Sequence, residues 1–155
     1  FNIAIRYLSE DDEVQVVTAT TGDDEPELER VLDGEEILAA QRLVRRVPVA
    51  EEVARYAVRL VDASRPGQPN APEFMARWVK WGASLRASQA LVLGGKARAL
   101  IDGRYAVSVS DVRALAPAIL RHRIVTNFYA ESDGVDADEI VRRLLEAVPA
   151  PSSGL

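Results

Sequence analysis

From residue 34 to residue 148 the chain is a succession of short amphipathic segments, opened by capping residues and separated by proline or glycine. Apolar residues recur three or four positions apart inside these segments, which is the spacing of one face of an α-helix. Helices of this kind bury their apolar stripes against one another. The expected fold class is therefore mainly α, a helical bundle with one or two minor short strands.

The start and stop signals place the individual helices. Four pairs have the spacing of a cap, namely Ser9 with Asp12, Asp33 with Glu36, Ser108 with Asp111, and Asp136 with Glu139. The expected helices cover about residues 10–20, 35–46, 50–64, 73–81, 85–102, 109–122 and 137–147. Gly94 and Gly95 lie inside the 85–102 helix and each costs on the order of 1 kcal/mol of helix propensity relative to alanine. Such a cost suggests that another backbone approaches closely there.

Strand signals are few. Residues 3–7 alternate apolar and polar side chains, which predicts a short strand. A lone strand is not stable, so it pairs late in this chain or belongs to a sheet outside it. Residues 104–107 are a second expected strand, with residues 124–129 as its partner.

Charge is unevenly distributed along the chain. Residues 1–36 hold 12 acids and 2 bases, residues 37–123 hold 6 acids and 15 bases, and residues 124–155 hold 6 acids and 2 bases. A basic middle block can face a phosphate group, an acidic partner or nucleic acid. Arginines on helix faces are more commonly solvated, and no groove-reading motif accompanies the charge, so nucleic acid is not an expected partner.

Several classes of chemistry are excluded. The chain has no cysteine and one histidine, His122, which rules out thiolate and multi-histidine metal sites. It has no phosphate loop, dinucleotide-binding motif or nucleophile elbow. Clustered acids at residues 23–25 fit a solvated linker better than a cation site, so no metal site is predicted. Trp78 and Trp81 are expected to anchor the core, and His122 to pack at a helix end.

No stretch of eighteen apolar residues is present, and the first residues lack a signal-peptide pattern, so a cytoplasmic protein without a membrane span is expected. Residues 149–155 are expected to form a loose tail.

Residues 78–124 carry three motifs in a fixed order. Gly82-Ala83-Ser84-Leu85-Arg86-Ala87 opens a long helix, Gly103-Arg104-Tyr105-Ala106-Val107 forms a turn, and residues 111–117 followed by Leu120-Arg121-His122-Arg123 form the next helix. This order and spacing resemble the C-terminal lid of MoxR-type AAA+ ATPases, relatives of the magnesium-chelatase ATPase subunit. One departure is Leu85, where the family usually has proline; another is Leu8, where it has proline after the strand tyrosine.

The resemblance implies a domain organisation. Residues 1–8 correspond to the last strand of an ATPase core that lies outside this chain, residues 9–34 to a helix and acidic linker, residues 35–148 to the helical lid, and residues 149–155 to a flexible tail. The core would supply the phosphate loop and the acids that hold ATP and Mg. This chain alone would then be inactive, and its own status as an enzyme stays open. The implied partners are the core, a homo-oligomeric ring, expected to be a hexamer, and a von Willebrand factor A domain protein.

The resemblance also implies a site. Arg86 corresponds to the family's second sensor, the catalytic and nucleotide-binding arginine of the lid. An arginine in the first turn of a helix lies beside free backbone N–H groups, where an anion is stabilised. Ser84 is expected to cap this helix, and Ala87, being small, to leave room for the adenine side of the nucleotide.

The function implied is a lid that closes over ATP and couples hydrolysis to chaperone-like remodelling or metal-centre assembly. Two alternatives stay open at this point. The chain could be a stand-alone helical protein-interaction module. It could also bind nucleic acid, with residues 111–122 as the reading helix beside a ribbon of residues 104–107 and 124–129.

Overall fold

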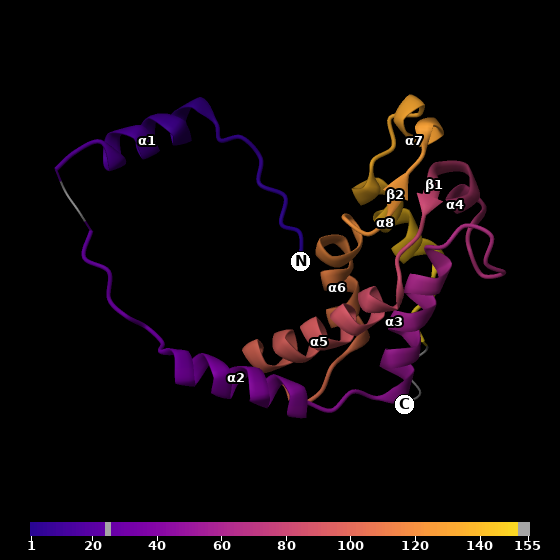
Figure 1. The fold of residues 1–155 in the computed structure, drawn as a ribbon, viewed down its shortest axis with the longest axis horizontal. Helices are drawn as coiled ribbons and strands as arrows, with labels where there is room; N and C mark the ends of the chain where they lie inside the picture. Colours follow the sequence, from indigo (N-terminus) through magenta and orange to yellow (C-terminus); the bar gives the residue numbers. More distant parts are fainter. Residues whose placement is uncertain (24–25, 152–155) are drawn as a thin grey trace.

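The computed structural model of the chain describes residues 1–23 and 26–151. This part of the chain is mainly helical, as expected, and contains one small two-stranded sheet (Figure 1). Its elements are α1 (Glu10–Thr20), α2 (Gly34–Arg46), α3 (Glu51–Ala63), α4 (Glu73–Trp78), β1 (Val79–Trp81), α5 (Leu85–Ile101), α6 (Val109–Leu120), β2 (Val125–Thr126), α7 (Phe128–Ser132) and α8 (Ala137–Ala147).

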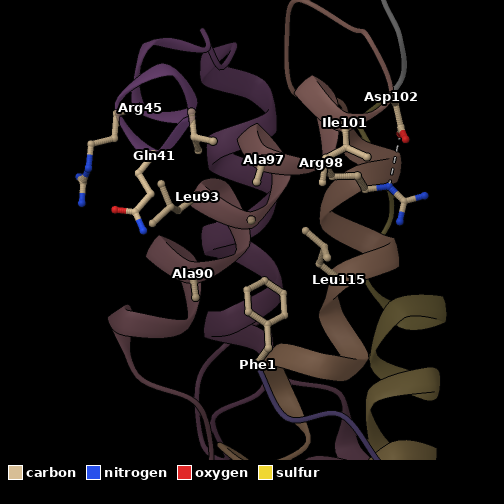
Figure 2. A pocket seen from close by; sticks show the side chains of 12 residues that line it. Phe1, Gln41, Arg45, Ala90, Leu93, Ala97, Arg98, Ile101, Asp102 and Leu115 are labelled. Carbon is tan, nitrogen blue, oxygen red and sulfur yellow. Dashed lines mark ion pairs between the residues drawn. The ribbon is translucent and has the colours of Figure 1, made fainter. Parts of the chain in front are cut away.

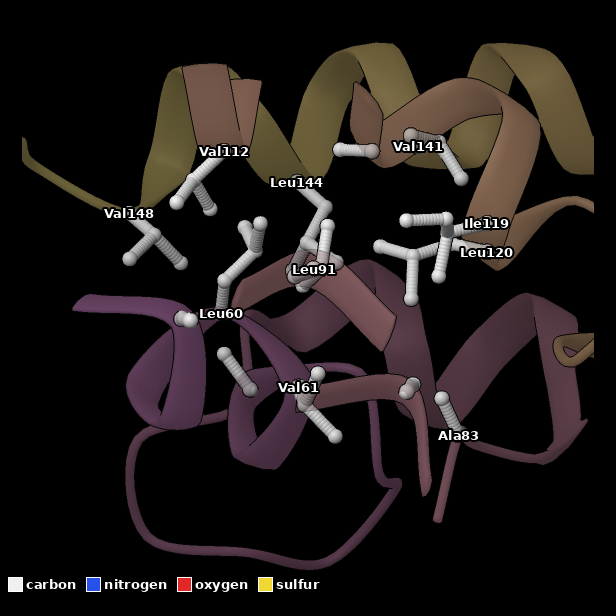
Figure 3. Packing of buried hydrophobic residues seen from close by; sticks show 14 of the residues in the cluster. Leu60, Val61, Ala83, Leu91, Val112, Ile119, Leu120, Val141, Leu144 and Val148 are labelled. Atoms are coloured by element: carbon white, nitrogen blue, oxygen red, sulfur yellow. The ribbon is translucent and has the colours of Figure 1, made fainter. Parts of the chain in front are cut away.

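The hydrophobic core lies where α3, α5, α6 and α8 meet (Figure 3). Leu60 comes from α3, Leu91 from α5, Ile119 from α6 and Leu144 from α8, and all four side chains are fully buried. Each burial of this size contributes about 1.5–3 kcal/mol relative to an exposed side chain. The long α5 helix packs against both α3 and α6, and these contacts fix the position of its central turns.

The capping signals at α2 and α6 are confirmed. Asp33 and Glu36 form both bonds of a capping box at α2, and Ser108 and Asp111 do so at α6. Asp136 accepts the Glu139 N–H at 2.8 Å and begins α8. These helices start where the sequence places them because the capping residue and its partner lie only three positions apart.

The expected pairing of residues 104–107 with residues 124–129 is wrong, although Val125 and Thr126 of the second segment do form a strand, β2. Residues 104–107 form no strand, and Val107 makes only an isolated parallel bridge to Val49. β2 pairs antiparallel with β1, which occupies the last three residues of the expected 73–81 helix. The buried Val79 favours this extended path. The short helix α7 was also missed, although Asn127 caps it by accepting from the Tyr129 and Ala130 N–H groups.

The two tryptophans have different environments. Trp78 is buried, donates its indole N–H to Asp133 at 2.8 Å, and lies under the guanidinium of Arg143. Trp81 is 66% exposed, so its expected role as a core anchor is wrong. The β1–β2 register is irregular between Val79 and Trp81, which keeps these two residues from sharing the buried face.

Beyond its first two residues, the N-terminal segment lies outside the bundle. Every described residue from 1 to 32 is exposed, and α1 stands apart from the other helices (Figure 1). The expected strand at residues 3–7 is not formed, because no neighbouring strand is available to it in the described part of the chain. One backbone bond, from the Asn2 N–H to the Ala118 carbonyl at 2.7 Å, ties the segment to the end of α6.

The glycine pair in α5 makes room for side chains, not for another backbone as expected. A Cβ at Gly95 would lie 2.7 Å from Val107 Cγ1, and one at Gly94 would lie 2.8 Å from the ring of Phe1. The two glycines thus allow α6 and the chain before it to approach α5 closely.

The loose tail expected at residues 149–155 stays a prediction. Residues 149–151 form no helix or strand, and residues 152–155 lie outside the described residues. Asp24 and Glu25 of the acidic cluster also lie outside them. In the described ranges no helix is long and apolar enough to cross a bilayer, and no three metal-ligating side chains come together.

Candidate functional site at the start of helix α5

Arg86 lies in the first turn of α5 and is exposed. Within the described residues its guanidinium makes no hydrogen bond or ion pair. The two neighbours predicted with it lie differently. Ser84 is exposed at the N-cap position but its hydroxyl makes no capping bond, contrary to expectation. Ala87 is fully buried in the core, so its side chain faces α5's packing partners and is not open to a nucleotide.

The charge around this helix start is unusual for the molecule. Among the helices of the described part, α5 is the only one with no acidic residue in its first turn. An acid at that position would neutralise the partial positive charge of the helix N-terminus. At α5 that charge adds to the positive charge of Arg86, so the site favours an anion.

The turn before α5 is fixed by the end of α3. The buried hydroxyl of Ser64 accepts the Ala83 N–H at 3.0 Å and donates to the Val61 carbonyl at 2.6 Å. Arg65 Nε donates to the Ala83 carbonyl at 2.8 Å. Both backbone groups of Ala83 are therefore bonded to side chains that lie 18 and 19 residues earlier in the chain. Arg65 also lies 3.4 Å from Asp62.

Gly82 is what allows this close contact. A Cβ on Gly82 would lie 2.3 Å from the Ser64 carbonyl oxygen and 2.6 Å from the Arg65 Cα. These are backbone atoms that cannot rotate away, so no larger residue fits without moving α3 or the turn. Gly82 therefore lets the segment before α5 pack directly against the residues that follow α3.

A second arginine of the family motifs has a structural role. Arg104 donates to both carboxylate oxygens of Asp111, at 2.8 and 2.6 Å, and Asp111 also accepts the Ser108 N–H at 2.8 Å. The Asp111 side chain is 1% exposed. Burial opposes its ionisation, but the hydrogen bonds from Arg104 and Ser108 outweigh burial and lower its pKa to about 2. The sequence signal for this pair is a Gly-Arg turn whose arginine lies seven residues before the acid of a capping box.

A groove also lies between α2, α5 and α6 (Figure 2). It has a volume of about 780 Å³ and a largely apolar wall, and the ring of Phe1 occupies part of it. It is lined by Phe1, Gln41, Val44, Arg45, Ala90, Leu93, Gly94, Ala97, Arg98, Ile101, Asp102 and Leu115. Arg86 is not among these residues, so this groove is separate from the anion-favouring helix start.

His122 is exposed, which corrects the expectation of a packed histidine. Its pKa is lowered, first by partial desolvation and then by the positive charge of Arg123. Because of this shift, His122 is a weaker base than an ordinary histidine and adds little charge to its surroundings at neutral pH.

Residues 75–144 match the family model described as the AAA lid domain. This range starts in α4 and ends in α8, so it includes the α5 start with Arg86.

Curated relatives match over a longer range. Chaperone MoxR1 of Mycobacterium tuberculosis is 29% identical over 97% of this chain and 40% of its own length. An uncharacterized protein YeaC of Bacillus subtilis is 31% identical over 97% of this chain and 45% of its own length. Protein MoxR of Methylorubrum extorquens is 32% identical over 78% of this chain and 37% of its own length. The chain thus spans less than half the length of these relatives.

A solved structure supports the same relationship. The crystal structure of a Cytophaga hutchinsonii protein whose assignment as an ATPase is provisional superposes with a TM-score of 0.83 at 27% identity. The superposition covers 94% of this chain and 44% of that protein. Residues 75–144 thus form an AAA lid domain, and the resemblance to MoxR-type AAA+ ATPases is confirmed.

Proposed function

We propose that this chain is the lid of a MoxR-type AAA+ ATPase, and that Arg86 is the sensor that binds the terminal phosphate of ATP held by a core outside this chain. The observation that carries the proposal is an exposed Arg86 with no partner among the described residues, at a helix start that lacks any acid. Arg104, by contrast, is paired within this chain, whereas an arginine without such a partner at an acid-free helix start can bind an anion.

The mechanism follows from the position of Arg86. Its guanidinium donates charge-assisted hydrogen bonds to phosphate oxygens, and the free N–H groups of the α5 start add to the attraction. These bonds exist only while the terminal phosphate is present. The closed orientation of the lid is therefore favoured with ATP and loses that advantage after hydrolysis, which converts a chemical step into motion.

The remaining roles follow from the family. The core supplies the phosphate loop and the acids that hold Mg, and residues 1–8 add the last strand to its sheet. The whole protein works as a homo-oligomeric ring, with a hexamer as the expected form, in the cytoplasm. It acts with a von Willebrand factor A domain protein in chaperone-like remodelling or metal-centre assembly. One relative is named a chaperone, which supports the remodelling role.

Neither alternative is favoured by an observation. The nucleic-acid hypothesis needs a ribbon of residues 104–107 and 124–129, and that ribbon is not formed. It also needs α6 as a reading helix, but α6 contributes Val112, Ala116, Ile119 and Leu120 to the core. The match to a lid family over residues 75–144 argues against an unrelated stand-alone interaction module.

The test is Arg86→Ala in the longer protein that contains this chain. We expect ATP turnover to fall about tenfold or more, because a donor to transferring phosphate is lost. The free energy of unfolding should change by less than about 0.5 kcal/mol, as for other exposed side chains. The matched control is Arg59→Ala, which removes another exposed helix arginine and should leave turnover unchanged. Unchanged turnover in Arg86→Ala would contradict the proposal.

A further inference from the structure

The start of α5 lacks the local features that usually fix a helix start. Ser84 makes no capping bond, and the first helical position is Leu85, which unlike proline does not preset the backbone. The first turn also has no acid. Sequence-local interactions therefore do not determine the direction in which α5 leaves the turn.

The missing restraint comes from the two residues that directly follow α3. Ser64 and Arg65 bond the two backbone groups of Ala83, the residue directly before the N-cap. Ser64 is fully buried and its hydroxyl is used as both donor and acceptor, so its orientation is fixed. Gly82 brings the backbones of the two segments into contact.

Ala83 lies three residues before Arg86, and between them the chain enters the helix. A shift of Ala83 therefore moves the first turn of α5 and the guanidinium with it. Catalytic contacts depend steeply on such placement, since a displacement of 1 Å can cost a large factor in rate.

We propose that Ser64 and Arg65 are positioning residues for Arg86, and that their bonds to Ala83 hold α5 in the orientation that presents Arg86 to the nucleotide phosphate. This inference rests on the proposed function. It assigns a functional role to two side chains that do not touch the ligand themselves.

The experiment is a double-mutant cycle on ATP turnover in the longer protein that contains this chain. Arg65→Met removes the Nε–H donor to the Ala83 carbonyl but keeps the apolar stem, and should lower kcat about tenfold. In an Arg86→Ala background the same change should lower kcat less than about twofold, because Arg65 acts through Arg86. Arg59→Ala, in the preceding helix α3, is the control and should leave kcat unchanged in both backgrounds.

A rescue distinguishes positioning from general stabilisation. Leu85→Pro restores a backbone restraint at a position whose N–H has no partner within the helix. In the Arg65→Met background it should recover most of the lost turnover, while it should change kcat little in the unaltered protein. Ser64→Ala provides a second route, since it removes the other bond to Ala83 and should show the same loss and the same rescue.

The outcomes separate the two hypotheses. Unchanged kcat in Arg86→Ala overturns the proposed function, and this inference with it. A loss in Arg86→Ala combined with normal kcat in both Arg65→Met and Ser64→Ala overturns this inference alone. Losses that multiply in the double variant also overturn it. Circular dichroism melts keep the assays below each variant's melting temperature; a variant that does not fold is replaced by Arg65→Lys, which should lose less than Arg65→Met.

Discussion

The starts of α5 and α6 show two ways of fixing a helix. At α6, the capping box of Ser108 and Asp111 works within three residues, and Arg104 completes it from the preceding turn. At α5, no local cap is formed, and the restraint on Ala83 comes from the two residues that directly follow α3. The first is self-contained, whereas the second depends on the packing of two distant segments.

The two arginines differ in the same way. Arg104 forms ion pairs with Asp111 and Asp102 within the lid, whereas Arg86 has no partner in the described part of the chain. An arginine of a shared motif is therefore not a functional residue by virtue of the motif alone. The difference indicates that the lid keeps one guanidinium for its own fold and presents the other outward.

The largest predicted loss of stability comes from removing the Asp111 carboxylate at the start of α6. Asp111→Asn leaves the partly buried Arg104 without its carboxylate and should lower the free energy of unfolding by about 3 kcal/mol. Urea unfolding followed by circular dichroism measures this change. Asp102→Asn is the control: its carboxylate also bonds Arg104 but is exposed, so its loss should cost less than about 1 kcal/mol. Equal losses of unfolding free energy in the two variants would show that the buried Asp111–Arg104 pair stabilises the fold no more than the exposed Asp102–Arg104 pair does.

A smaller loss of stability is expected at low pH, where the Asp111 carboxylate becomes protonated. The folded pKa of Asp111 is about 2, below its ordinary value of 3.8. A depressed carboxyl pKa contributes stability that is fully present above about pH 4 and is lost as the pH falls toward 2. This loss should be on the order of 2 kcal/mol for the unaltered chain. It should be smaller in Asp111→Asn; an identical pH profile in the two proteins would refute the assignment.

The smallest effect compares the two serines directly. Ser108→Ala removes a capping bond and should destabilise the chain by about 1 kcal/mol. Ser84→Ala occupies the equivalent position at α5, where no capping bond exists, and should change the free energy of unfolding by less than about 0.3 kcal/mol. Equal losses from the two substitutions would mean that Ser84 does cap α5 in solution.

Sequence patterns predicted the helices well where a local signal defines them. The capping pairs at Asp33, Ser108 and Asp136 gave correct helix starts, because each cap involves atoms three residues apart. Ser84 satisfies the same preference in sequence yet makes no bond. Residue type alone does not determine whether a side chain turns toward its own helix.

Long-range pairings were not predictable in the same way. β2 could equally have paired with residues 104–107, since both segments are short and rich in β-formers. The actual partner, β1, is selected by the buried Val79 and by the packing of α4 and α7 around it. Trp81 was misplaced for the same reason, because an irregular register decides which face it occupies.

The candidate site was predictable only in part. Arg86 was identified from the family resemblance, and its exposure was not evident from periodicity. The bonds from Ser64 and Arg65 left no sequence pattern, because they join segments 18 and 19 residues apart through backbone groups. Ala87 was expected from its small size to leave room for a ligand. Its side chain is instead buried in the core, and the sequence pattern did not indicate this burial.

The close packing at Gly82 limits which amino acids can be substituted at this position. Its φ is not in the left-handed region, so the backbone itself does not demand glycine. The demand comes from the Ser64 carbonyl, 2.3 Å from where a Cβ would be. A saturation library at this codon should therefore return glycine almost alone, and a second-site suppressor would have to shorten or shift the end of α3.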